Sequence, residues 1–277
     1  MSNANIHPIP PFLYGTAWKE EATKNLTLLA MQSGFRGIDT ANQRKHYYEE
    51  AVGQGIAEFL QEGVVSREEL FLQTKFTFQA GQDDRLPYDP HATYAKQVEQ
   101  SFESSLQHLQ TDYIDSYVLH GPMLRHGLHD ADLEAWQAME TVHQQGYTKL
   151  LGVSNVSIKQ LEALYKHAKS KPAFVQNRCY AELGWDQEVR SFCQKNNIIY
   201  QGFSLLTANR HVLAHVKVQN MAKGLKITPA QVIFCFSSQI GMLPLTGTTN
   251  TMRMLQDLEA LNLSLESHEI DFLTKIG

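Results

Sequence analysis

The sequence has few cysteines and no pattern that would pair them or bind a metal. Cys179, Cys193 and Cys235 are the only three among 277 residues, and no C-x-x-C motif occurs. An odd number of widely spaced cysteines is typical of reduced cytoplasmic thiols rather than of a disulfide framework or a zinc site. We therefore expect these thiols to pack as small buried hydrophobic side chains, and we expect no bound metal.

Long apolar runs and an excess of positive charge are also absent. No stretch reaches the ~18 apolar residues of a membrane span. The N-terminal sequence MSNANIHPIPPFLYG lacks the basic start and long apolar run of a secretory signal. The net charge is −5 with scattered basic residues, which argues against nucleic acid or an anionic membrane as a partner. We expect a cytoplasmic protein. The sequence shows no heptad pattern that would indicate a coiled coil, so we expect a monomer.

The composition is that of one globular domain. Hydrophobic residues make up 43% and charged residues 19%, which is ordinary for a folded enzyme. No linker rich in Pro, Gly or Ser divides the chain, and there is no short repeat or low-complexity tract. Residues 1–277 are therefore expected to form a single domain.

Short apolar runs alternate with longer segments of helical period along the whole chain. The predicted strands are 12–16, 36–41, 69–75, 112–120, 150–155, 173–178, 198–204 and 241–247. The predicted helices are 20–33, 49–60, 91–109, 132–145, 157–168, 186–195, one beginning at Thr228, and 252–261. Eight such units in about 250 residues predict a closed (β/α)8 barrel. An open doubly wound sheet is the alternative, but no G-x-G-x-x-G follows the first strand.

Polar residues end several of the predicted strands. Catalytic groups of (β/α)8 barrels lie at the carboxyl ends of the strands. Asp39, Lys75 and His120 end three successive strands, so we expect them to converge. Taken singly, Asp39 could cap the following turn, Lys75 could extend into solvent, and His120 could be a hydrogen-bonded histidine at the rim of the barrel. Buried charges need partners, which predicts an Asp39–Lys75 pair.

The segment NQRKHYYEE, which follows Asp39, adds two tyrosines, Tyr47 and Tyr48. A phenol beside an ammonium would have a lowered pKa and could exchange a proton with an alcohol or alkoxide.

Seven spaced segments give the chain a resemblance to a known family. They are GIDTA (37–41), FLQTK (71–75), DYIDSYVLHGP (112–122), GVSN (152–155), FVQN (174–177), GFSLL (202–206) and PLTGTT (244–249). Together they resemble the aldo-keto reductases. The resemblance implies a (β/α)8 barrel that reduces aldehydes or ketones with NADP(H), using an Asp, Tyr, Lys and His tetrad. Asp39, Lys75 and His120 match the first, third and fourth members.

The tyrosine does not match the family spacing. In the family pattern a tyrosine follows GIDTA after a short gap, and a helix that resembles EEAVG (49–53) comes next. The family's distance from this helix places the tyrosine position at His46, whereas its distance from Asp39 places it at Arg44. We predict Tyr47 as the general acid, with Tyr48 and His46 left as alternatives.

The resemblance also implies the cofactor site. Thr16 and Ala17 would lie by the nicotinamide ribose, and Asp39 would also contribute to cofactor binding. Ser154, Asn155 and Gln176 would hold the carboxamide, Phe203 would stack on the nicotinamide ring, and Ser204 and Leu206 would line the pyrophosphate. Thr248 and Thr249 would meet the adenosine phosphate end, Arg253 would lie against adenine or the 2′-phosphate, and Gln256 and Asp257 would lie near the adenine amine. Many members that prefer NADPH have lysine where this chain has Gly247. Arg253 still favours NADP(H), and use of NAD(H) stays open.

Two further expectations concern the substrate. The chain ends soon after its last predicted helix and the stretch 121–135 is short, which predicts an open pocket for a small carbonyl or alcohol. Trp18, Phe76 and Trp136 are candidates for its apolar wall, although Trp136 could equally pack in the core or on the surface. Two other functions fit a barrel of this kind. It could be an NADP(H)-binding redox-sensing or scaffolding subunit with little turnover, or a lyase or isomerase that uses no nicotinamide.

Overall fold

Eight parallel strands close into a barrel in the computed structural model, which describes residues 9–277. The strands are β1 (Leu13–Gly15), β2 (Gly37–Asp39), β3 (Phe71–Phe76), β4 (Ile114–Leu119), β5 (Thr148–Ser154), β6 (Phe174–Arg178), β7 (Ile199–Phe203) and β8 (Met242–Thr246). Each strand pairs with its neighbours in chain order, and β1 pairs with β8. The predicted barrel is confirmed, and the open sheet is excluded because closure leaves no edge strand.

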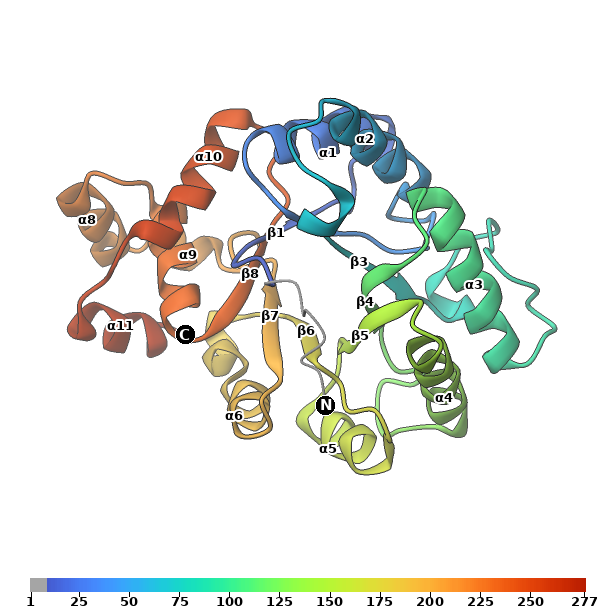
Figure 1. The fold of residues 1–277 in the computed structure, drawn as a ribbon. Helices are drawn as coiled ribbons and strands as arrows, with labels where there is room; N and C mark the ends of the chain where they lie inside the picture. The colour runs from blue at the N-terminus through green and yellow to red at the C-terminus, as the bar shows by residue number, and fades with distance from the viewer. Residues whose placement is uncertain (1–8) are drawn as a thin grey trace, which may run out of the picture.

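Helices form a ring outside the strands (Figure 1). They are α1 (Thr23–Gln32), α2 (Glu49–Gln61), α3 (Tyr94–Leu109), α4 (Asp130–Gln144), α5 (Ile158–His167), α6 (Gln187–Lys195), α7 (Arg210–Ala214), α8 (Val216–Leu225), α9 (Pro229–Gln239), α10 (Thr251–Glu259) and α11 (Ser267–Thr274). The sequence patterns predicted neither α7 and α8, which follow β7, nor the terminal α11. The other helices match predicted segments to within a few residues.

Two helices begin where their capping residues predict. The Ser157 hydroxyl accepts a hydrogen bond from the backbone N–H of Gln160 at the start of α5. Thr228 does the same for Gln231 at the start of α9, and Pro229 occupies the first helical position. These bonds satisfy backbone donors that have no partner inside a helix.

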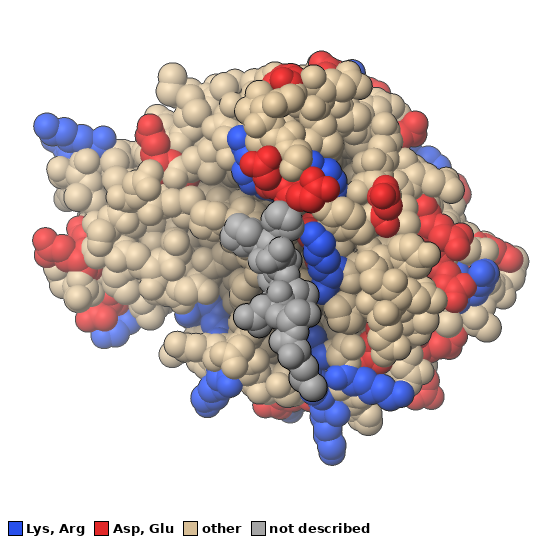
Figure 2. Space-filling view, viewed as in Figure 1, with Lys and Arg blue, Asp and Glu red and all other residues tan. Residues whose placement is uncertain are grey.

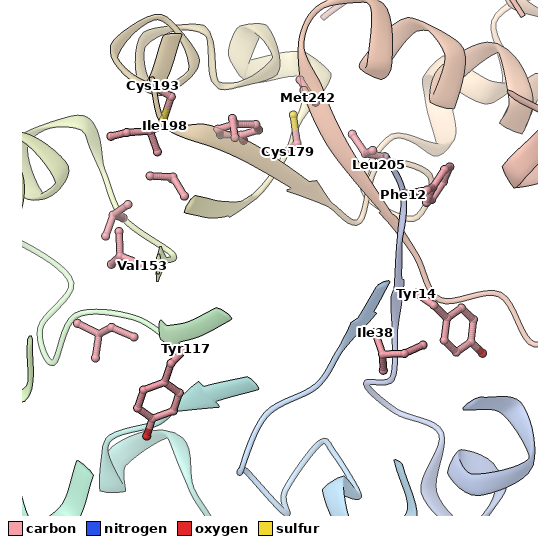
Figure 3. Packing of buried hydrophobic residues seen from close by; sticks show 14 of the residues in the cluster. Phe12, Tyr14, Ile38, Tyr117, Val153, Cys179, Cys193, Ile198, Leu205 and Met242 are labelled. Atoms are coloured by element: carbon pink, nitrogen blue, oxygen red, sulfur yellow. The ribbon is translucent and has the colours of Figure 1, made fainter. Parts of the chain in front are cut away.

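The main hydrophobic layer lies between the strands and the helices. Tyr14, Ile38 and Tyr117 belong to it, on the helix-facing sides of their strands (Figure 3). The rings of Phe102 on α3 and Tyr117 on β4 meet edge to face, with centroids 4.8 Å apart. All three cysteines are buried and free, as predicted.

The barrel interior is filled in layers, because alternate residues of each strand point inward. The lower layer is an apolar cluster of Leu13, Phe71, Phe174, Leu243 and Leu245. Gln73 and Gln176, which lie two residues beyond Phe71 and Phe174 on β3 and β6, are each hydrogen-bonded to Gln201 on β7. The polar layer therefore lies above the apolar one, toward the carboxyl ends of the strands.

Three features concern membranes, metals and the distribution of charge. Within residues 9–277, no helix is long and apolar enough to cross a membrane. The same residues contain no group of three or more His, Cys, Asp or Glu that could hold a metal ion. On the face shown in Figure 2, basic and acidic side chains are interspersed. The prediction about a secretory signal depends partly on residues 1–8, which lie outside the described range.

The contact between α2 and α3 yields a testable prediction. A Cβ added at Gly53 on α2 would overlap the backbone carbonyl of His108 on α3. Gly53→Ala should therefore lower the free energy of unfolding by about 1–3 kcal/mol, as overpacking does. Gly224 on α8 is the matched control, because an added Cβ there meets nothing within 4 Å. Gly224→Ala should be neutral or stabilising by up to about 1 kcal/mol. Urea denaturation of both variants measures the difference, and equal midpoints would contradict it.

Candidate active site

A cavity of about 980 Å³ opens at the carboxyl ends of the barrel strands. Its wall includes Asp39 from the end of β2, His120 from just after β4, and Tyr47 from the loop between β2 and α2. Lys75 on β3 lies behind this wall and is fully buried. The residues that the sequence analysis expected to converge therefore do so at one end of one cavity.

Lys75 and Asp39 form the buried ion pair that the sequence predicted. The Lys75 ammonium donates to both carboxylate oxygens of Asp39, at 2.7 and 2.8 Å, and to the carbonyl of Thr40 at 2.7 Å. All three ammonium hydrogens thus have acceptors. Burial lowers the pKa of Lys75, and the adjacent Asp39 carboxylate opposes that shift.

The polar layer of the barrel supports the Asp39 carboxylate from below. Its Oδ1 accepts from the side-chain amides of Gln73 at 2.7 Å and Gln176 at 3.0 Å. Both glutamines also donate to Gln201 Oε1. The carboxylate therefore has fixed partners on two other strands, β3 and β6, and its position is determined by the barrel itself.

His120 is held as a neutral imidazole. Its Nδ1 lies 2.7 Å from the Thr77 hydroxyl, and its backbone carbonyl accepts from Asn155 Nδ2 at 2.8 Å. Burial, followed by the charges of Lys75 and His46, holds the pKa of His120 well below its usual value. Near neutral pH this side chain is therefore a hydrogen-bonding group without charge.

The three candidates for the proton donor lie in different surroundings. Tyr47 lines the main cavity, with its ring centroid 5.2 Å from Lys75 Nζ and 5.8 Å from the His120 ring centroid. Tyr48 does not line the main cavity; it borders a second, smaller cavity, which Tyr47 also borders, and lies under the Arg44 guanidinium. His46 stacks on Trp18 with ring centroids 3.9 Å apart. Tyr47 is thus the member of this segment that reaches the Asp39 and His120 end of the cavity.

The pKa of Tyr47 differs from the sequence-based expectation. Burial and then the Asp39 carboxylate raise it, whereas a nearby ammonium was expected to lower it. The physical reason is that the Asp39 carboxylate balances the positive charge of Lys75, and all three hydrogens of the ammonium are donated to Asp39 and Thr40. The phenol consequently stays protonated near neutral pH, as a proton donor requires.

The predicted cofactor residues lie around the rest of this cavity. Its lining includes Ala17, Asp39, Ser154, Asn155, Gln176, Phe203, Ser204, Leu206, Thr248, Thr249, Arg253, Gln256 and Asp257. Thr16 is the exception, since it is fully buried and its hydroxyl donates to the Asp39 carbonyl. Asn155 and Ser204 have positive φ angles of 56° and 57°, so the chain turns sharply where it leaves β5 and β7. Such backbone strain is common at functional sites.

Three cations also line the cavity that were not predicted from the sequence, namely Lys19, Arg178 and Arg210. Lys19 is buried, its ammonium donates to the Gly247 carbonyl at 2.7 Å, and burial lowers its pKa to about 8. Arg178 could have been found, because it lies two residues after Gln176 and so shares the inward face of β6. Lys19 and Arg210 lie outside the strands and carried no such signal.

The expected apolar wall is only partly correct. Trp18 lines the cavity and is 70% exposed. Phe76 was a wrong candidate, and Trp136 packs in the core, which was the alternative given for it; both are fully buried in the layer between strands and helices. Phe76 packs against Phe78 and Tyr88, and the Trp136 indole donates to the Ser170 carbonyl.

Comparison with known proteins agrees with this geometry. The Aldo/keto reductase family model matches residues 13–277. The human aldo-keto reductase family 1 member C4 is 30% identical over 96% of this chain and 88% of its own length. Bovine prostaglandin F synthase 1 is 30% identical over 95% and 87%. The crystal structure of an aldo/keto reductase from Brucella melitensis superposes with a TM-score of 0.82 at 25% identity, covering 97% of this chain and 94% of that one.

The chain therefore belongs to the aldo/keto reductase family, and the predicted resemblance is confirmed. Membership supports an oxidoreductase that reduces carbonyl compounds.

Asp257, in the cofactor part of the cavity, yields a pH-dependent prediction. Burial raises the pKa of this carboxyl to about 6, while the Thr246 hydroxyl that donates to it opposes the shift. An acid whose pKa is higher in the folded state stabilises the fold below its unfolded pKa, and that contribution is lost as the pH rises through about 6. Asp257→Asn keeps an acceptor for Thr246 but cannot ionise.

Relative to wild type, Asp257→Asn should gain roughly 2–3 kcal/mol of unfolding free energy between pH 4 and pH 8. Chemical denaturation at both pH values measures this, with Asp271→Asn on α11 as a control at an exposed carboxylate. A stability difference between Asp257→Asn and wild type that does not change with pH would contradict a raised pKa.

Proposed function

We propose that this protein reduces aldehydes or ketones to alcohols, with NADP(H) as the cofactor and NAD(H) as the alternative. The observation that carries the proposal is that Asp39, Tyr47 and His120 line one end of a single cavity, with the Lys75 ammonium buried directly behind them. A protonated phenol and a neutral imidazole beside one another suit the delivery of a proton to a carbonyl oxygen.

The residues divide the work of the reaction. A reduced nicotinamide, when bound, supplies the hydride for the carbonyl carbon. His120 hydrogen-bonds the carbonyl oxygen and orients it, and Tyr47 gives its proton to the developing alkoxide. Lys75 and Asp39 tune the phenol as a pair: the Lys75 ammonium lies 5.2 Å from the centre of the Tyr47 ring, and the Asp39 carboxylate that balances its charge keeps the phenol protonated until the proton is transferred.

The remainder of the cavity fits a nucleotide with phosphates. Four cations, Lys19, Arg178, Arg210 and Arg253, line it together with the predicted cofactor residues. Of its two carboxylates, Asp39 is paired with Lys75, and Asp257 accepts from Thr246. The excess of positive charge favours an anionic ligand. Phe203 offers a flat face for a nicotinamide ring, and Asn155 and Gln176 offer side-chain amides for its carboxamide.

Preference for NADP(H) has support despite Gly247. The Lys19 ammonium contacts the Gly247 carbonyl, so a cation is present beside the position where many relatives have lysine. Arg253 lies in the first turn of α10, in the same region, and can hold a phosphate through several N–H groups. We also propose that the enzyme acts as a monomer in the cytoplasm, where its three free thiols would stay reduced.

Replacing the proposed acid tests the mechanism. Tyr47→Phe should lower the turnover of NADPH oxidation by about 10²- to 10⁴-fold across a panel of small aldehydes and ketones, because the proton donor is lost. NADPH affinity, followed by quenching of tryptophan fluorescence, should change little. Tyr48→Phe is the matched control and should keep the wild-type turnover, since Tyr48 does not line the main cavity.

Full activity of Tyr47→Phe together with loss in Tyr48→Phe would transfer the role to Tyr48. If the wild-type protein bound no nicotinamide nucleotide, the proposal that it is a nicotinamide-dependent reductase would be wrong. Tight NADPH binding without turnover over the whole panel would favour the redox-sensing or scaffolding role.

A further inference from the structure

Thr77 makes a hydrogen bond to the histidine of the proposed site from outside the main cavity. It lies two residues beyond Lys75, just after β3, and its Oγ1 is 2.7 Å from His120 Nδ1. The Thr77 carbonyl accepts from the Tyr88 hydroxyl at 2.8 Å and from Gln82 Nε2 at 3.3 Å. These bonds anchor the Thr77 backbone, so its hydroxyl is presented to the imidazole from a fixed position.

His120 is fixed from its own side as well. Its backbone N–H donates to the Phe76 carbonyl at 2.9 Å, and its carbonyl accepts from Asn155 Nδ2. His120 borders the main cavity and Thr77 does not. With Nδ1 directed at Thr77, Nε2 is the ring nitrogen left for a ligand in the cavity.

Burial determines the direction of the hydrogen bond between these side chains. Thr77 is 6% exposed, and within residues 9–277 its hydroxyl has no hydrogen-bond partner other than Nδ1. If Nδ1 carried the proton, the hydroxyl hydrogen would be left without an acceptor, at a cost of roughly 1–3 kcal/mol. If the hydroxyl donates to Nδ1 instead, both groups are satisfied and the ring proton must lie on Nε2.

We propose that Thr77 is a positioning residue that fixes His120 as the tautomer with hydrogen on Nε2. This inference rests on the proposed function, in which His120 donates to the substrate carbonyl oxygen. The other tautomer would present a lone pair to that oxygen and repel it. Burial and neighbouring positive charge lower the pKa of His120, so protonation of both nitrogens does not remove the need for the correct tautomer.

The first test reads the tautomer without cofactor or turnover. Long-range ¹H–¹⁵N spectra of the imidazoles should show His120 of the wild type with its hydrogen on Nε2 alone. Twelve histidines contribute signals, and the His120 signal is the one missing from His120→Gln. In Thr77→Val the Nδ1 and Nε2 resonances should move toward each other, as a mixture of tautomers requires, whereas Thr77→Ser should keep the wild-type pattern.

Wild-type His120 with its hydrogen on Nδ1, or Thr77→Val with unchanged resonances, would overturn the inference. Because these spectra need no substrate, they still decide the role of Thr77 if the wild type proves to have no carbonyl reductase activity and the proposed function fails.

The second test is a double-mutant cycle on turnover. Thr77→Val should lower kcat roughly ten-fold with little change in the KM for NADPH, which corresponds to the loss of about one hydrogen bond. Thr77→Ser should restore most of kcat. In the His120→Gln background, Thr77→Val should have no further effect, because Thr77 acts through the imidazole. Additive losses in the double variant would show that Thr77 acts independently of His120 and would overturn the proposal.

Discussion

The site depends on the buried ion pair between Asp39 and Lys75. A charge at the centre of a barrel is costly unless its hydrogen-bonding capacity is filled, and removing one partner of such a pair typically costs about 3–5 kcal/mol. Here the lysine is fully buried, and all three of its hydrogens reach oxygen atoms of Asp39 and Thr40. The side-chain amides of Gln73 and Gln176 donate further hydrogen bonds to the Asp39 carboxylate. The pair therefore links β2, β3 and β6 through one carboxylate.

This arrangement determines the electrostatics of the cavity above it. Because the Lys75 charge is balanced by Asp39, it does not lower the pKa of Tyr47, and burial keeps that phenol protonated. The same ammonium disfavours a second positive charge on His120. One buried pair thus accompanies two neutral hydrogen-bonding side chains at the same end of the cavity.

The barrel and its polar strand ends were predictable because they follow simple periodicities. Eight apolar runs separated by helical segments require a parallel sheet, and strand ends that carry Asp39, Lys75 and His120 meet at its carboxyl edge. The pairing of the first two follows from the cost of burying single charges. Arg178 lay within reach of the same reasoning, since it shares an inward-facing side of β6 with Gln176.

The loops were harder to predict because their geometry depends on tertiary contacts. The Gln43 carbonyl accepts the backbone N–H groups of both His46 and Tyr47, and the Trp18 N–H donates to the His46 carbonyl. These bonds determine which ring of the segment 46–48 enters the main cavity, and no residue count could reveal them. Thr77 is similar, because its bond to His120 joins two loops that follow different strands. The helices α7 and α8, which were not predicted, pack beside α9.

The closed barrel also explains how a cation can be supplied from an unexpected part of the chain. Since β1 pairs with β8, the loops that follow these strands lie side by side although 228 residues separate Lys19 from Gly247. A Cβ added at position 247 would lie 3.6 Å from the Lys19 ammonium, at van der Waals distance, so the two residues are direct neighbours. The fold thus brings a cation from the loop after β1 to the loop after β8. The loss of a cation at one family position is thus compatible with an anion-binding site at the same place.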